Sequence, residues 1–156
     1  MTEERKRYLL KGVVDLHVHT APSISPRELD VGDMAKDAME YGLAGFVAKD
    51  HYFCSTGDCQ LINKYVCGGK EICFGLMAMN NSVGGFNLKA VSTACEMGTR
   101  VISLPTVSAQ EHQDFNKRPN VVPFKATGIS PIGEKPIKFT DDKGEVVPEL
   151  VEILEY

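Results

Sequence analysis

The sequence has no surplus of basic residues and no long apolar run. Its 156 residues include 17 Lys and Arg against 21 Asp and Glu, which gives a formal net charge of −4. A nucleic-acid-binding surface needs a basic excess or a basic stripe to neutralise phosphates, so this balance argues against a nucleic-acid partner. A membrane-spanning helix needs about 18 consecutive apolar residues, and no segment approaches that length. We therefore expect neither nucleic acid nor a membrane among the partners.

Signals for export and for a disulfide framework are also missing. The first eleven residues are charged and contain only three consecutive apolar residues, where a signal peptide would have a longer apolar core. The cysteines form an odd set without a CxxC pair: Cys54, Cys59, Cys67, Cys73 and Cys95. This spacing disfavours disulfides, zinc ribbons and iron–sulfur clusters. We expect reduced cysteines that pack as small hydrophobic residues in a cytoplasmic protein.

The motifs of several enzyme classes are absent. The sequence has no GxSxG elbow, no Walker A loop and no GxGxxG after a strand, and no cysteine stands in a familiar catalytic frame with histidine. What remains is a composition with 43% apolar and 24% charged residues, typical of a globular protein. The length suits a single domain that covers residues 1–156.

Short apolar runs alternate with amphipathic stretches along the first two thirds of the chain. We expect strands at residues 12–19, 45–50, 72–79 and 100–104. Helices are expected at 31–41, at 86–97, and from a cap at Ser55 through Val66. This alternation predicts right-handed βαβ units and a parallel sheet.

The last third of the chain changes character. Ser108 and Glu111 have the spacing of a capping box that opens a short helix, and residues 120–134 read as a long loop. Residues 137–139 and 145–147 predict a hairpin, and Pro148 fits the first turn of a final helix. The predicted fold is thus α/β: four parallel βα units with a hairpin and a trailing helix.

Four βα units make about half of a (β/α)8 TIM-type barrel, which typically has about 250 residues. A small open sheet that is complete in itself is the alternative. An open half-barrel would leave two strand edges unpaired, so a homo-oligomer that completes the barrel is a candidate assembly.

The strongest chemical signal lies on the first strand. Side chains alternate along a strand, so Asp15, His17 and His19 share the face opposite Val14 and the other apolar residues. The two histidines are about 6.6 Å apart at Cα and can converge on one cation at nitrogen–metal distances near 2.1 Å. We predict a divalent metal at His17 and His19, with zinc as the first candidate and manganese or iron as alternatives. Asp15 could orient a histidine or join the ligands.

The second strand ends in Lys49, Asp50 and His51. If Phe46 packs outward, Lys49 and His51 face the same axis as the first histidine pair. A lysine there is costly to desolvate unless it meets an anion or a substrate carbonyl. We predict catalytic roles for Lys49 and His51 and a metal-ligand role for Asp50. The alternative is that Lys49 pairs with an aspartate and that His51 caps the next helix.

Later polar residues complete the candidate site. Asn80 and Asn87 flank the Gly84-Gly85 pair after the third strand, and Thr106 follows the fourth; we predict that all three contact a small-molecule substrate. The glycine pair alone is weak evidence, because any tight turn would use it. His112 is predicted as a further metal ligand or proton carrier, with a solvated surface residue as the alternative.

These motifs resemble known families. The run from Asp15 through His17 and His19 to Thr20 resembles the first-strand HxH motif of the amidohydrolase superfamily, and that of the polymerase-and-histidinol-phosphatase (PHP) phosphoesterases. The pair Asp50-His51 resembles the second-strand Asp-His of the PHP enzymes. Lys49–His51, together with residues 80–87 and 105–106, most resembles a group of amidohydrolase-like cytosolic proteins. The similarity covers nearly the whole chain and corresponds to the first half of such a protein.

The resemblance implies a TIM-type barrel in which one or two divalent metals activate water for the hydrolysis of an ester, lactone or amide. His17 and His19 match the motif directly. The later-strand histidines and the general-base aspartate of these families have no counterpart in the chain, and the fourth strand lacks the lysine that carries a carbamate in the best-known amidohydrolases. A PHP-type phosphoesterase is the enzymatic alternative, with Lys49 balancing the phosphate charge. A non-catalytic half-barrel that binds metal or assembles with a partner is the alternative of another class.

Overall fold

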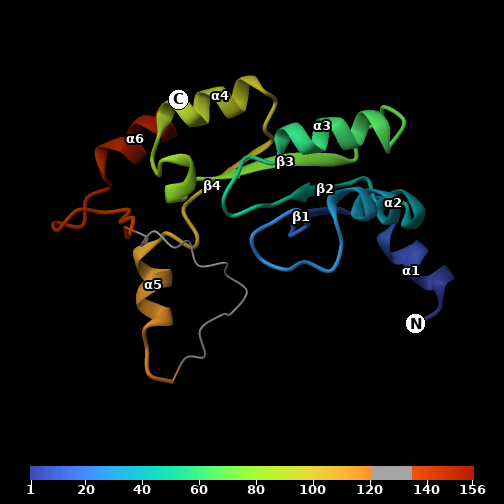
Figure 1. Cartoon of the computed structure of the whole chain (residues 1–156), viewed down its shortest axis with the longest axis horizontal. Helices are drawn as coiled ribbons and strands as arrows, with labels where there is room; N and C mark the ends of the chain where they lie inside the picture. The colour runs from blue at the N-terminus through green and yellow to red at the C-terminus, as the bar shows by residue number, and fades with distance from the viewer. Residues whose placement is uncertain (121–134) are drawn as a thin grey trace.

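The four predicted strands form one parallel sheet. A computed structural model describes residues 1–120 and 135–156. Within them, the strands follow each other in the order β1-β2-β3-β4, and every neighbouring pair is parallel. Their bounds are Val14–Val18 for β1, Gly45–Ala48 for β2, Cys73–Ala78 for β3 and Val101–Ser103 for β4. The sheet is curled, and the fold is α/β, consistent with a partial barrel (Figure 1).

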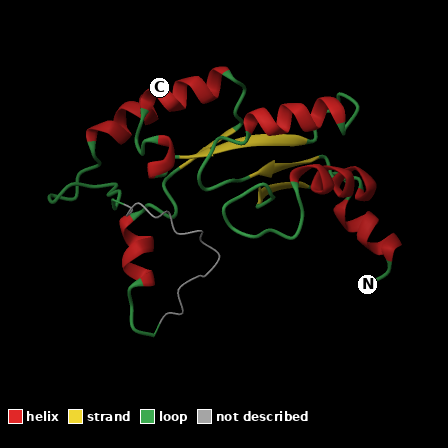
Figure 2. Cartoon of the chain, viewed as in Figure 1, coloured by secondary structure: helices red, strands yellow, loops and turns green. Residues whose placement is uncertain are grey.

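Helices connect and surround these strands. Figure 2 shows the strands at the centre, with the helices around them. The connecting helices are α2 (Val31–Tyr41), α3 (Thr56–Tyr65) and α4 (Leu88–Glu96). The others are α1 (Glu3–Leu10), the short 3-10 helix η1 (Asn81–Val83), α5 (Gln110–Asn116) and α6 (Pro148–Glu155). No helix in the described residues is long and apolar enough to cross a membrane.

Local sequence signals set the ends of α2 and α6 as predicted. The carboxylate of Asp30 accepts a hydrogen bond from the backbone amide of Asp33, which satisfies a free donor of the first turn of α2. Gly42 ends α2 with a positive φ of 76°, a conformation that glycine adopts without a steric cost. Pro148 occupies the first turn of α6, where its missing N–H is not needed.

Ser55 precedes α3 as predicted, but neither Ser55 nor Ser108 makes a side-chain capping hydrogen bond. The hydroxyl of Ser55 donates to the carbonyl of Ala48 and accepts from the amide of Leu76, so it bridges β2 and β3 instead of capping α3. The hydroxyl of Ser108 accepts from the amide of Asn81, and α5 begins at Gln110 without a side-chain cap. In both places a tertiary partner competes successfully for the hydroxyl.

The predicted hairpin is reduced to a turn. Its two arms make a single antiparallel bridge, between Thr140 and Val146, and no strands. The carboxylate of Asp141 accepts from the amides of Lys143 and Glu145, which holds the turn together. The loop predicted at residues 120–134 lies, except for residue 120, outside the described residues.

The two faces of the sheet have different environments. Phe46 and Ala48 of β2 pack in one cluster with Ala35 and Ala38 of α2, on the side of the sheet that the helices cover. Val47 belongs to a separate cluster with residues of β3. The predicted outward packing of Phe46 is therefore correct, and it places the alternate residues of β2 on the opposite face.

The apolar face of β1 departs from the prediction. Val18 packs against the same cluster as Phe46, but Leu16 is 68% exposed and Val14 is also exposed. The reason is position: β1 is an edge strand, and among the described residues only β2 pairs with it. Alternation along β1 therefore gives Val14 and Leu16 a common face, but it does not bury them.

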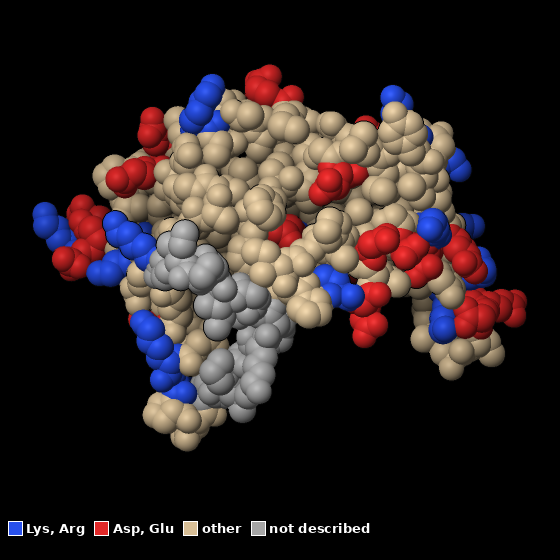
Figure 3. Space-filling view, in the orientation of Figure 1, with Lys and Arg blue, Asp and Glu red and all other residues tan. Residues whose placement is uncertain are grey.

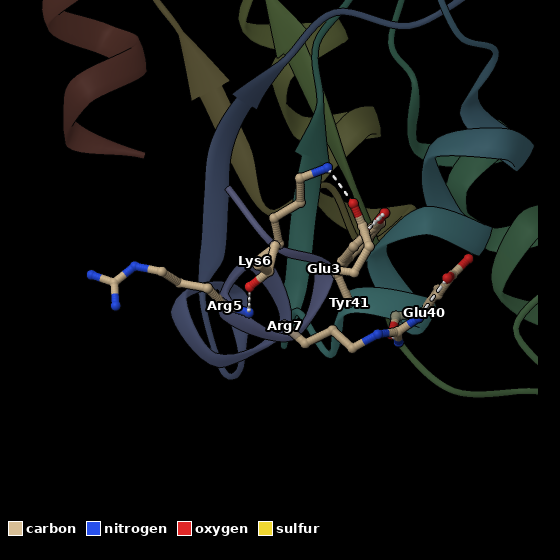
Figure 4. Close-up of polar contacts among 7 residues, drawn as sticks. Glu3, Arg5, Lys6, Arg7, Glu40 and Tyr41 are labelled. Atoms are coloured by element: carbon tan, nitrogen blue, oxygen red, sulfur yellow. Dashed lines mark hydrogen bonds and ion pairs between the residues drawn. The ribbon is translucent and has the colours of Figure 1, made fainter.

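Polar side chains of α1 contact α2 (Figure 4). The hydroxyl of Tyr41 donates to the carboxylate of Glu3 at 2.9 Å, and the guanidinium of Arg7 pairs with the carboxylate of Glu40 at 2.6 Å. These contacts lie at the surface, where water screens the charges, so each pair contributes little to stability. Elsewhere, Figure 3 shows basic side chains interspersed with acidic ones over the visible face.

The cysteines are free, as expected. Cys59, Cys67 and Cys73 are buried and pack in the cluster between α2, α3 and the sheet. The thiol of Cys73 donates to Cys59 at 2.7 Å. This hydrogen bond and burial raise the pKa of Cys73, so its thiol stays protonated. Cys95, by contrast, is exposed.

A glycine on β3 gives a direct test of the packing of α3. A Cβ added to Gly75 would lie 2.4 Å from the Cα of Thr56, so the helix backbone would have to move. We expect Gly75→Ala to lower the free energy of unfolding by about 3 kcal/mol or more, measured by urea denaturation. Gly57→Ala in α3 is the matched control: it meets open space, and replacing a helical glycine should raise stability by up to about 1 kcal/mol. Equal stabilities of the two variants would contradict the packing.

Candidate functional site

Three of the four histidines, His17, His19 and His51, gather where β1 and β2 end, and we call them the imidazole cluster. The Nε2 atoms of His17 and His19 are 3.1 Å apart, and their ring centroids are 5.0 Å apart. The ring of His51, which follows β2, lies 4.6 Å from that of His19. Because β1 and β2 are parallel neighbours, the chain segments that leave their carboxyl ends meet at one edge of the sheet.

A backbone carbonyl fixes the protonation of His19. The Nδ1 atom of His19 lies 3.0 Å from the carbonyl oxygen of Lys49. A carbonyl can only accept, so Nδ1 must carry the hydrogen of this bond. Burial, followed by the charges of nearby Arg27 and His17, lowers the pKa of His19 and favours the neutral ring. In that ring Nε2 holds a free lone pair, the form in which a histidine binds a metal.

The separation of the two Nε2 atoms allows two states. Without a cation, His17 can donate a hydrogen bond from Nε2 to the lone pair of His19. With a cation, both atoms would point lone pairs at it. Nitrogens that each lie about 2.1 Å from one ion are about 3.0 Å apart at a right angle and about 3.4 Å apart at the tetrahedral angle. The observed separation of 3.1 Å falls within this range, so the two nitrogens can occupy two ligand positions around one metal ion.

His51 is held by a polar network from the next two loops. Its Nδ1 atom lies 2.9 Å from the hydroxyl oxygen of Thr106, and its backbone carbonyl accepts from the amide group of Asn80. Burial, then the charges of His19 and Lys49, lowers the pKa of His51 to about 4. His51 is therefore neutral at physiological pH and can serve as a proton acceptor or as a ligand.

Asn80 is a buried connector and not a substrate contact. It is 1% exposed. Its side-chain nitrogen donates to His51 and Thr106, while its oxygen accepts from the amides of Thr106 and Ser108. Two donated and two accepted bonds use the hydrogen-bonding capacity of the amide, which leaves none for a ligand. The predicted substrate role of Asn80 is corrected on this ground. Thr106 also contributes through the network, as a partner of His51.

Lys49 is buried without a charge partner. It is 8% exposed, and its side chain makes no ion pair or hydrogen bond among the described residues. Burial lowers the pKa of its ammonium. The alternative in which Lys49 pairs with Asp15 or Asp50 is not observed.

The remaining predicted residues have local structural contacts. The carboxylate of Asp50 accepts from the amides of Tyr52 and Phe53, and Asn87 caps α4 through the amide of Ala90. The charge of Asp50 also acts on His51, where it partly offsets the lowering of the pKa, but no contact among the described residues makes its carboxylate a partner of the histidines. Asn87 is used as a cap and is not aimed at the site.

His112 lies apart from the cluster. Its Nε2 is 2.9 Å from the side-chain nitrogen of Asn116, one turn along α5. No contact within the described residues links His112 to the other three histidines. The placement matches the alternative of a helix-surface residue rather than a metal ligand.

The described residues supply some, but not all, of the ligands that a catalytic metal site needs. Within residues 1–120 and 135–156, no group of three or more His, Cys, Asp or Glu side chains is arranged to hold a metal ion. His17 and His19 supply two converging nitrogens, whereas a catalytic zinc typically has three protein ligands and a water. The pair therefore fits a cation only if further ligands are added to it.

Two features of the site have no clear sequence signal. The carbonyl of Lys49 orients His19, although the motif draws attention to the lysine side chain. Arg27, in the loop after β1, lies near enough to His19 and His51 for its charge to lower the pKa of both. A loop arginine among serines and prolines is unremarkable in sequence, and only the fold brings it to the cluster.

Residues 12–156 match the model of a family described as a family of unknown function, DUF6282. The chain belongs to the DUF6282 family. Every residue of the imidazole cluster and its network lies inside the matched range. No curated protein and no solved structure matches the DUF6282 chain.

The lowered pKa of His51 predicts a pH-dependent stability of this DUF6282 chain. His51 takes up a proton at about pH 4 in the folded state, against about 6.5 in the unfolded state, so the unfolded chain binds more protons between these values. The free energy of unfolding should fall as the pH drops from 6.5 to 4. We expect His51→Gln to flatten this slope in urea denaturation series, while His112→Gln keeps it. Identical slopes for both variants would contradict the assignment.

Proposed function

We propose that the chain is a half-barrel of a metal-dependent hydrolase of the amidohydrolase type. In this proposal a divalent ion binds to Nε2 of His17 and of His19, with zinc as the first candidate and manganese or iron as alternatives. The observation that carries the proposal is the geometry of the two rings: Nε2 of His19 lies 3.1 Å from Nε2 of His17, while Nδ1 of His19 lies 3.0 Å from the carbonyl oxygen of Lys49.

A bound divalent ion supplies a water of lowered pKa and polarises the substrate's carbonyl or phosphoryl oxygen. The side chains of this chain have separate tasks around it. His51, neutral and oriented by Thr106, accepts or returns a proton. Lys49 offers a positive charge to the substrate at the end of β2. The Asn80 network keeps His51 and Thr106 in register.

The two-nitrogen set requires further ligands. Under the proposal these come from strands that complete the barrel, either in a second copy of the chain or in another partner. The edge of β1 that no described residue pairs with and the exposed Leu16 support such an addition, because an uncovered apolar edge strand favours pairing. The five free cysteines support a reducing compartment, the cytoplasm.

Metal analysis and a substrate panel test the proposal. The chain is stripped with a chelator, dialysed against zinc or manganese, and analysed for bound metal and for mass in solution. It is then assayed on p-nitrophenyl esters, lactones, amides and p-nitrophenyl phosphate. We expect about one ion per copy and metal-dependent hydrolysis of an acyl substrate. A metal-free monomer that is inert with both metals would favour a non-catalytic module.

A phosphoesterase of the PHP kind is the second candidate. The buried, unpaired Lys49 favours it, because a phosphate would balance that charge. Hydrolysis of p-nitrophenyl phosphate without any acyl hydrolysis would select this candidate over the first.

A further inference from the structure

Lys49 is a largely buried lysine next to the imidazole cluster. It is 8% exposed, and no carboxylate pairs with its ammonium among the described residues. A partly desolvated charge without a partner is unfavourable, and proteins relieve it by pairing it or by binding an anion. The fold thus holds a positive group in a place where an anionic ligand would lower its free energy.

Arg27 brings a second cation to the same place. Its Nε atom is buried and makes no hydrogen bond, and its guanidinium forms no ion pair among the described residues. Its charge acts on His19 and His51, the same two rings on which the charge of Lys49 acts. The loop after β1 and the segment after β2 therefore each place a cation near enough to His19 and His51 for its charge to act on both rings.

Two carboxylates of the same segments, Asp15 and Asp50, are engaged by backbone amides. Asp15 accepts a hydrogen bond from the amide of His17, and Asp50 accepts from the amides of Tyr52 and Phe53. Neither forms an ion pair with Lys49 or Arg27 within the residues that the structure describes. The positive charge is left available to a ligand.

We propose that Lys49 and Arg27 form a subsite for a doubly charged oxyanion, the phosphate group of a small-molecule substrate. The inference rests on the proposed hydrolase function, whose substrate class it names. Two cations match the two charges of a phosphate monoester. The guanidinium provides N–H donors in a planar fork, including the unpaired Nε, and the ammonium provides a compact point charge. Arg27 would then determine specificity for substrates that carry a phosphate group. The bond that is hydrolysed need not belong to that phosphate.

Binding of inorganic phosphate by the metal-free chain tests the subsite. Isothermal titration calorimetry at pH 8, with a chelator present, should detect phosphate binding to the wild-type chain. Arg27→Gln and Lys49→Gln should each weaken it at least tenfold. Acetate, with a single charge, should bind at least tenfold more weakly than phosphate. Equal affinity for acetate would overturn the double-charge assignment.

Matched controls separate this effect from general electrostatics. Arg5→Gln in α1 and Lys64→Gln in α3 each remove one exposed positive charge far along the chain from the cluster and should change phosphate affinity less than twofold. A drop in the controls as large as in Arg27→Gln would overturn the subsite. Should Lys49→Gln fail to fold, as judged by circular dichroism, Arg27→Gln in its surface loop still decides the question.

The two proposals fail in different ways. Loss of zinc binding in His17→Asn with phosphate binding retained supports the subsite independently of the metal. Zinc binding in the wild type combined with unchanged phosphate affinity in Arg27→Gln overturns the subsite and leaves the metal proposal standing. Absence of phosphate binding at millimolar concentration in the wild type overturns the subsite outright.

Discussion

The variant His19→Asn should lose zinc affinity by at least about 100-fold. Asparagine places its side-chain N–H near the position of Nδ1, so the hydrogen bond to the carbonyl of Lys49 can persist while the Nε2 lone pair is removed. Loss of an outer-shell partner alone typically weakens metal binding 10- to 100-fold, and loss of a direct ligand should have a larger effect. Competition with a chromophoric chelator measures the affinity.

The controls for this prediction come from the same residue type. His112→Asn, on α5, should bind zinc like the wild type, because His112 contacts Asn116 and not the cluster. His17→Asn should match the loss seen in His19→Asn, since the two Nε2 atoms face each other. If His19→Asn and His112→Asn bind zinc equally well, the cation is held somewhere else and the proposed metal centre is wrong.

The parts of the site that the sequence could predict are those set by strand periodicity. A period of two puts His17 and His19 on one face of β1 whatever the tertiary structure, and the parallel order of β1 and β2 follows from the βαβ pattern. The same alternation places Phe46 against α2 and therefore Lys49 on the opposite face. Backbone geometry alone is enough for these predictions.

The parts that could not be predicted depend on competition between partners. Asn80 reads as a loop residue free to contact substrate, but four polar groups from two other segments bond to its side-chain amide. Asn87 lies in a segment whose composition is typical of a ligand-binding loop, but its side-chain oxygen accepts from the amide of Ala90 at the start of α4 instead. Arg27 carries no periodic signal. In each case the contacts of the side chain depend on which groups lie near it in the folded chain, and the sequence spacing does not reveal those neighbours.

The second large effect concerns this network: Asn80→Ala should lower the free energy of unfolding by roughly 3–5 kcal/mol. The substitution removes the side-chain oxygen that accepts from the amides of Thr106 and Ser108, and the N–H that donates to the carbonyl of His51. Removing the partner of a buried polar group typically costs about 1–3 kcal/mol. Urea denaturation of the wild type and the variant measures the difference.

The donor and acceptor groups of Asn80 should each contribute to the free energy of unfolding. Asn80→Asp keeps an oxygen for the amides of Thr106 and Ser108 but loses the N–H groups that reach His51 and the Thr106 hydroxyl, so it too should be destabilising. Asn116→Ala, which removes an asparagine whose contacts stay inside α5, should cost less than about 1 kcal/mol. An Asn80→Ala chain as stable as Asn116→Ala would mean that the loops after β2, β3 and β4 are not held by this amide, and the orientation of His51 would then need another cause.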